Sequence, residues 1–139
     1  MSINVTFPGG VKVNAHIEPF VISTDQPVKA GGEGSAPAPF TLFLASLATC
    51  AGYYVKAFCD SRQLDTTGMH LTMDTVHDPE NKIIEKFLIR IHVPAGFPEK
   101  YDGALVNAAA VCAVKRHLSE KIMHEIVVVR ETWDVGRET

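Results

Sequence analysis

Three cysteines carry the most distinctive chemistry in this 139-residue chain: Cys50, Cys59 and Cys112. A free thiol in an apolar helix is usually a small buried side chain, but a thiolate is a nucleophile that can pass through a sulfenic acid to a disulfide. An odd, low count behind an N-terminus without a secretory pattern argues against a disulfide scaffold. We therefore expect a cytoplasmic protein whose thiols are either inert or redox-active.

Helical geometry separates the three thiols. Cys50 and Cys59 are nine positions apart on one predicted helix, which places them about half a turn out of phase and ~13 Å apart along the axis. A disulfide needs Cα atoms within ~7 Å, so an intact helix cannot bridge this pair. Cys59, near the end of that helix, is expected to be structural or incidental. Cys50 and Cys112 lie on two different predicted helices and can approach each other if these helices pack.

Two cations follow Cys112 by about one helical turn. Lys115 and Arg116 are candidates for favouring its thiolate, because a nearby positive charge stabilises the charged form of a cysteine.

The hydrophobic pattern predicts an α+β fold. Period-two alternation on both sides of Pro8-Gly9-Gly10 predicts a hairpin with one buried face, followed by a short strand at 20–23 and a loop at 24–38. An apolar helix is expected over about 39–62, strands at 70–74 and 86–93, a helix from near 98 to about 117, and a last strand at 125–133. The order βββ-α-ββ-α-β predicts a single domain over residues 1–139 with a mostly antiparallel sheet.

Composition excludes several classes of function. Charged residues make up 21% of the chain and the net charge is −3, so there is no basic face for nucleic acid or for an anionic membrane. The apolar stretch from Phe40 to Phe58 is interrupted by polar residues and is more simply a core helix than a membrane span. The six histidines show no metal-ligand spacing, so we expect no metal and no cofactor.

Two segments resemble the signature of the OsmC/Ohr family. Residues 31–55 read GGEGSAPAPFTLFLASLATCAGYYV, a Gly-rich loop followed by a Pro-led apolar helix with Cys50 eleven positions after Pro39. Residues 108–121 read AAAVCAVKRHLSEK, which is similar to the family's second cysteine segment. The predicted element order agrees with that family over nearly the whole chain.

The resemblance implies an intertwined homodimer with two long central helices and active sites at the subunit interface. It implies a peroxidase of the oxidative stress response, in which Cys50 attacks an organic hydroperoxide, Cys112 resolves the sulfenic acid as a disulfide, and a cellular dithiol reduces that disulfide. An apolar substrate pocket would suit an organic peroxide; its expected residues are Phe40, Phe43, Leu47, Tyr53 and Tyr54.

The sequence departs from the family pattern beside the first cysteine segment. Peroxidase members carry a glutamate directly after the helix-starting proline, paired with an arginine from the N-terminal strands; here the position is Phe40, and no arginine precedes Arg62. Without this clamp, a buried Cys50 is expected to have a raised pKa and to be a poor nucleophile. Lys12, Lys29 or Glu33 could substitute in part as charge partners. The alternative function is a non-catalytic module that binds a small molecule or senses redox state in the same dimer cavity.

Overall fold

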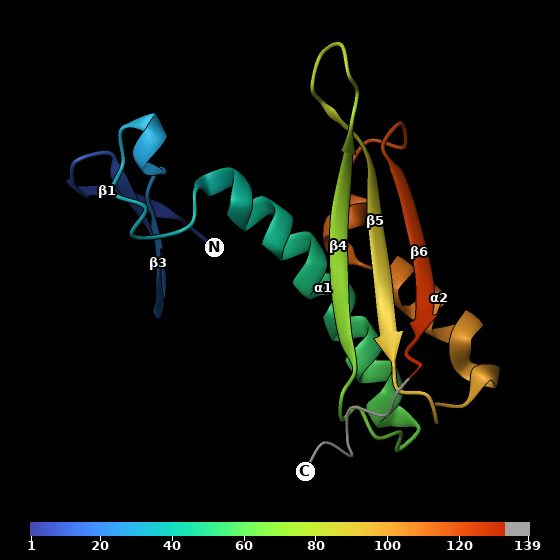
Figure 1. Cartoon of the computed structure of the whole chain (residues 1–139). Coiled ribbons are helices and arrows are strands. Elements are labelled where there is room, and N and C mark those ends of the chain that lie inside the picture. The colour runs from blue at the N-terminus through green and yellow to red at the C-terminus, as the bar shows by residue number, and fades with distance from the viewer. Residues whose placement is uncertain (133–139) are drawn as a thin grey trace. The chain divides into compact units, whose positions relative to one another are not determined.

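The computed structural model describes residues 1–132, and residues 133–139 lie outside the description. It divides into two compact units, Met1–Ala45 and Ser46–Thr139, which are described separately (Figure 1). The element order confirms the predicted α+β fold class, with three strands, a long helix, two strands, a helical segment and a last strand. The prediction of a single domain over the whole chain stays a prediction, and the predicted end of the last strand at Trp133 falls outside the described residues.

The first unit is built on a three-stranded antiparallel sheet in the order β1-β2-β3. The strands are β1 (Asn4–Gly9), β2 (Lys12–Ile17) and β3 (Phe20–Thr24), followed by a short 3₁₀ turn, η1 (Val28–Ala30). Gly9 and Gly10 take positive φ angles of 147° and 56° at the hairpin turn, a conformation that glycine adopts without steric cost. The predicted hairpin and third strand are therefore present.

One face of this sheet is apolar but not buried. The register pairs Val5 with Ala15 and Ala15 with Ile22, so these side chains point to one side, together with Phe20. Val5, Phe20 and Ile22 are all exposed. The predicted buried face is thus wrong for the described chain. The physical reason is that three short strands form one layer, and a single sheet has nothing of its own to bury its apolar side against.

A buried carboxylate organises the loop that follows β3. Asp25 is only 1% exposed and accepts hydrogen bonds from the amides of Gln26 (2.8 Å), Glu33 (3.2 Å) and Ser35 (3.1 Å). The Ser35 hydroxyl also donates to it, over 2.7 Å. Gly32 passes so close to this loop that a Cβ on it would lie 1.9 Å from the Gln26 carbonyl oxygen. The Gly-rich segment is therefore an ordered loop that folds around the Asp25 carboxylate.

The second unit holds a mixed sheet in the order β4-β5-β6. Its strands are β4 (His70–His77), β5 (Ile84–Val93) and β6 (Met123–Arg130). β4 pairs with β5 antiparallel, whereas β5 pairs with β6 parallel. A parallel pair needs a crossover, and here it consists of η2 (Glu99–Tyr101), α2 (Asp102–Ala110) and α3 (Ala113–Arg116). The sheet of this unit is therefore mixed rather than antiparallel throughout.

The long helix α1 (Pro39–Ser61) supplies one wall of the core of the second unit. Ala51, Val55 and Cys59 repeat every four positions and form one buried stripe. They cluster with alternate residues of β5, among them Ile91, and with Leu105 of α2. By length and composition alone α1 could also cross a membrane, but its buried stripe packs against strands and a helix of the same unit.

The predicted second helix is broken at Cys112. α2 ends at Ala110, Cys112 adopts extended backbone angles (φ −41°, ψ 122°), and α3 starts at Ala113. The expectation of two long helices, with Cys112 inside the second, is therefore wrong, because α1 alone is long among the described elements. The break changes the chemistry available around the thiol, since a helix start leaves backbone amides without intrahelical partners.

The Asp25 cluster predicts an acid-sensitive step in unfolding. The Ser35 hydroxyl and then the Ser35 amide, with the amides of Gln26 and Glu33, lower the pKa of Asp25 to about 2, against the opposing effect of burial. A lowered folded-state pKa contributes stability above the unfolded value of ~3.9, and this contribution is lost as the pH falls towards 2.

We expect Asp25→Asn to lower the midpoint of chemical unfolding at neutral pH and to flatten its dependence on pH between about 4 and 2 by up to about one proton. Far-ultraviolet circular dichroism across this pH range measures both effects. Asp60→Asn, which changes an exposed carboxylate on α1, is the matched control. An unchanged acid slope in Asp25→Asn would contradict this account.

Candidate active site

The structure brings the Cys50 and Cys112 thiols together in the second unit. Cys50 projects from α1 and is half-buried, while Cys112 sits between α2 and α3 and is only 1% exposed. The Cys112 thiol is within hydrogen-bond reach of the Cys50 sulfur. It also lies 3.9 Å from the Leu47 carbonyl oxygen, one turn earlier on α1. No disulfide joins them, so the described state is a reduced dithiol.

Two backbone amides point at the Cys50 sulfur. The N–H groups of Val114 and Ala113 donate to it from the first turn of α3. These amides are available because the chain is extended at Cys112 and a new helix begins directly after it. Hydrogen bonds to the charged form of a titrating group favour that form. The helix break therefore supplies hydrogen-bond donors to the Cys50 thiolate, for which the sequence lacks the arginine of the family pattern.

These donors decide the sign of the pKa shift at Cys50. Burial raises the pKa of the thiol, but the Val114 amide, the Cys112 thiol and the Ala113 amide together outweigh burial, and the pKa is lowered from its ordinary value. The expectation of a raised pKa, based on the absent arginine clamp, is thus wrong in direction. The reason is that backbone donors act here where the family pattern uses a charged side chain.

Cys112 has the opposite character. Burial raises its pKa, and the neighbouring Cys50 raises it further, while the amides of Lys115 and Val114 pull it down only in part. The pair is therefore asymmetric: Cys50 is the group that ionises first, and Cys112 remains a thiol that can donate to it. Proton loss from either sulfur is coupled to the state of the other.

The structure places Lys115 and Arg116 beside the site, in the last helical segment, α3. The part of Lys115 that reaches Cys112 is its backbone amide, and its ammonium lowers the pKa of His124, after the larger effect of burial. Both cationic side chains line a groove of about 850 Å³ together with His124 and Glu125. The pKa of Cys112 is nevertheless raised, first by burial, and the prediction that these charges favour its thiolate stays a prediction.

Cys59 lies apart from this chemistry. It is fully buried in the core cluster of the second unit. Burial, and then the charge of Asp60, raise the pKa of its thiol, while Lys56 opposes them. This environment is that of an unreactive small core side chain, in keeping with the structural role expected for it.

The residues expected to form a substrate pocket occur as two aromatic pairs and one core residue. In the first unit Phe40 is exposed and stacks on Phe43, with ring centroids 5.6 Å apart. In the second unit Tyr53 is exposed and meets Tyr54 edge to face at 5.2 Å. Leu47 is buried beside Cys112. A pocket built from all five residues stays a prediction.

Glu33, the remaining predicted charge partner, is engaged within the first unit. Its carboxylate pairs with the Lys12 ammonium at 2.7 Å, and this ion pair raises the pKa of Lys12. Glu33 also donates its amide to the Asp25 carboxylate. These contacts bind the loop to strand β2.

Sequence reasoning missed the amides of Ala113 and Val114. Positions 111–114 contain no glycine or proline that would predict a break in the helix, and the alanine-rich run before them favours helix. The new helix begins at Ala113, directly after the cysteine.

The fold and the paired thiols define an α+β protein with a dithiol between a long helix and a broken one. The family model described as OsmC-like protein matches residues 32–127, which include both cysteines. The chain belongs to the OsmC-like family. No curated protein matches it.

Solved structures share the fold over most of the chain. One is a proposed osmotic stress induced and detoxification response protein from Psychrobacter arcticus 273-4, with a TM-score of 0.76 and 23% identity, covering 93% of this chain and 96% of that one. Another is the organic hydroperoxide resistance protein OsmC from Legionella pneumophila, with a TM-score of 0.56 and 21% identity, covering 92% and 96%. A third is an organic hydroperoxide resistance protein from Elizabethkingia anophelis, with a TM-score of 0.65 and 18% identity, covering 94% and 97%.

The asymmetry of the dithiol predicts selective alkylation. We expect iodoacetamide to modify Cys50 before Cys112 and Cys59 at neutral pH, because only Cys50 has a lowered pKa. Mass-spectrometric mapping of the rates against pH measures this order.

Cys112→Ala is expected to raise the apparent pKa of Cys50, since it removes a donor to the thiolate. Cys112→Ser, which keeps a hydroxyl donor, is the matched control and should raise it less. A titration midpoint for Cys50 above that of an ordinary thiol, about 8.5, would refute the assignment.

Proposed function

We propose that this protein reduces organic hydroperoxides with Cys50 as the attacking thiolate and Cys112 as the resolving thiol. The observation that carries the proposal is that the two thiols act on each other's pKa, which is lowered at Cys50 and raised at Cys112. A low-pKa thiolate beside a second thiol is the arrangement of cysteines that cycle through sulfenic acid. Structural relatives from Legionella pneumophila and Elizabethkingia anophelis are named organic hydroperoxide resistance proteins.

The first step forms a bond between the Cys50 sulfur and the terminal oxygen of the hydroperoxide. The O–O bond breaks, and the alkoxide leaves as an alcohol after taking up a proton. Cys50 becomes a sulfenic acid and the peroxide is reduced by two electrons. The amides of Val114 and Ala113 hold the thiolate before this step.

The second step joins the two cysteines. The Cys112 sulfur attacks the sulfenic sulfur of Cys50, a disulfide forms, and the hydroxyl leaves as water with the proton from Cys112. A dithiol of the reducing cytoplasm then restores both thiols by exchange and is itself oxidised to a disulfide. Because the two thiols are near enough in the reduced state to shift each other's pKa, Cys112 is the thiol available to resolve the sulfenic acid of Cys50.

The surroundings of Cys50 favour an organic substrate over hydrogen peroxide. Leu47 lies one turn before it on α1, and Tyr53 and Tyr54 lie one turn after it, so these side chains border the thiol on the helix surface. The exposed Tyr53 offers an aromatic surface next to the half-buried sulfur. Apolar contact of this kind stabilises an alkyl or aryl group of the substrate.

The experiment is a steady-state assay of cumene hydroperoxide consumption with dithiothreitol as reductant. We expect turnover in the wild type and a rate no higher than background in Cys50→Ser. In a separate reaction without dithiothreitol, Cys112→Ser should consume one equivalent of hydroperoxide and end in a dimedone-reactive sulfenic acid. Cys59→Ser, a buried thiol outside the site, is the control and should keep its activity. Absence of consumption by the wild type, with the hydroperoxide bound intact, would overturn the proposal in favour of a binding module.

We further propose that the protein works as a homodimer in which the apolar face of the β1-β2-β3 sheet contacts a second copy. Its exposed side chains include Val5, Phe20 and Ile22, together with the half-exposed Ala15 between them. Contiguous apolar surface of this kind is typical of a protein interface. A second copy of the chain can supply the missing layer to each sheet by the same symmetric contact.

Sedimentation velocity tests this assembly. The wild type should sediment at about twice the chain mass of 15.2 kDa. Phe20→Ser should raise the dimer dissociation constant by at least about tenfold, since it removes a large apolar contact. Val28→Ser removes an exposed apolar side chain away from the sheet and should leave the association unchanged. A monomeric wild type would contradict the proposal.

A further inference from the structure

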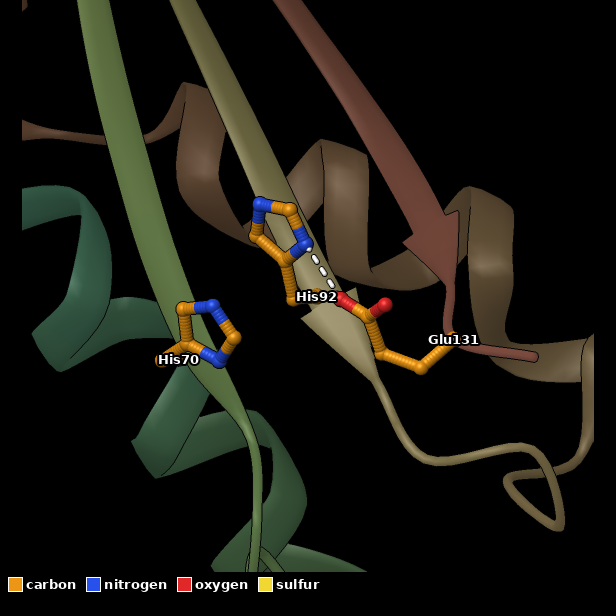
Figure 2. A group of neighbouring side chains, drawn as sticks. All are labelled: His70, His92 and Glu131. Carbon is orange, nitrogen blue, oxygen red and sulfur yellow. Dashed lines mark hydrogen bonds and ion pairs between the residues drawn. The ribbon is translucent and has the colours of Figure 1, made fainter. Parts of the chain in front are cut away.

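A group of metal-binding side chain types lies on the open face of the second sheet, away from its core. On β5 the residues Ile89, Ile91 and Val93 are buried against the core, so His92 points to the other side. The register places His70 of β4 directly opposite His92, and Glu131 follows the last residue of β6. Figure 2 shows His70 and His92 projecting from two neighbouring strands, and Glu131 projecting towards His92 from the segment just after β6. We refer to His70, His92 and Glu131 as the strand-end triad.

The triad is held together by short contacts. The imidazole rings of His70 and His92 stack with centroids 4.4 Å apart and an interplanar angle of 2°. The Nδ1 atom of His92 lies 2.7 Å from a carboxylate oxygen of Glu131, which the dashed line in Figure 2 marks. The side chains of His92 and Glu131 are only 15% and 25% exposed, so this pair is shielded on several sides.

We propose that the strand-end triad is a binding site for Zn²⁺ or a divalent ion of the same class. One ligand atom from each residue lies within 4.8 Å of the other two. Zinc binds imidazole nitrogens at ~2.0–2.1 Å and carboxylate oxygens at ~2.0–2.2 Å in tetrahedral geometry. Neighbouring ligand atoms around such an ion are therefore about 3.3 Å apart. The exposed His70 can close the remaining distance by rotating its side chain.

The second nitrogen of His92 is already placed as a metal-bound histidine requires. Its Nε2 atom lies 3.1 Å from the Thr72 hydroxyl on β4. When Nδ1 binds a metal, Nε2 carries the proton and donates it to this hydroxyl. Histidine ligands commonly bind an outer hydrogen-bond partner in this way, and the partner fixes the ring orientation. The ion would replace the proton that otherwise lies between Nδ1 and Glu131.

Glu131 differs from the other paired carboxylates on this face in the kind of partner it has. Two other carboxylates there pair with permanent cations: Asp74 with Arg90, and Glu125 with Lys86. In the ion pairs described for this face, Glu131 has only an imidazole as its partner. A bound dication would supply the positive charge that these other pairs already contain.

The backbone keeps the three ligands in place. The amide of Glu131 donates to the Val93 carbonyl oxygen at 3.0 Å, which continues the parallel pairing by one residue beyond β6. The guanidinium of Arg130, on the other face, forms a two-pronged ion pair with Asp102 at the start of α2. Ligands on hydrogen-bonded strands move little relative to one another, and three protein ligands leave a fourth position on the ion for water.

Isothermal titration of the reduced protein with zinc chloride tests the proposal. We expect the wild type to bind through the triad, and His92→Gln, Glu131→Gln and His70→Gln each to weaken this binding by at least about tenfold. His77→Gln, which changes an exposed histidine at the far end of the same strand as His70, is the matched control and should bind as the wild type does. Because all variants keep the three cysteines, differences among them report on the triad.

Thermal unfolding gives a second readout that does not depend on activity. Zinc should raise the unfolding midpoint of the wild type and of His77→Gln, and not that of His70→Gln, whose changed side chain is exposed and leaves the core intact. Circular dichroism confirms that each variant is folded before titration. No zinc binding by the wild type, or equal binding by all variants, which would assign the ion to the thiols, overturns the proposal.

Discussion

The interruption of the helix at Cys112, between α2 and α3, is the feature on which the candidate active site depends. A continuous helix would commit the amides of Ala113 and Val114 to carbonyls one turn earlier, and they could not reach a sulfur. The extended angles at Cys112 release them, and they act as hydrogen-bond donors that lower the pKa of Cys50. Two neutral hydrogen bonds thereby do what a cationic side chain does elsewhere: they favour the charged form of a thiol in a partly buried site.

The same break fixes the difference between the two sulfurs. Cys50 lies on the regular helix α1 and receives the donors, whereas Cys112 lies at the break itself and is almost completely buried. One thiol is thus prepared to ionise and the other to remain protonated beside it. Two small residues, Ala51 of α1 and Ala109 of α2, belong to the same core cluster as Cys59. The burial of Cys112 and the different acidities of the two thiols therefore both follow from the interruption of the helix at Cys112.

The second sheet divides its chemistry between its faces. One face packs Ile89, Ile91 and Val93 against α1 and α2, and the other carries a row of paired charges that ends at His92 and Glu131. This division follows from the period of two along a strand, which sends alternate side chains to opposite sides. His70 and His92 are neighbours because of the register between β4 and β5. No spacing motif in the sequence predicts this register.

The sequence by itself determined the order of elements, the α+β class and the resemblance around Cys50 and Cys112, because alternation, apolar runs and the Pro39-to-Cys50 spacing are local properties of the chain. Only the tertiary structure decided the sign of the Cys50 pKa shift, the interruption after Ala110 and the meeting of His70, His92 and Glu131. Each of these depends on which distant groups become neighbours. Burial, amide direction and strand register are set by packing over the whole unit, and a residue's type and spacing do not specify them.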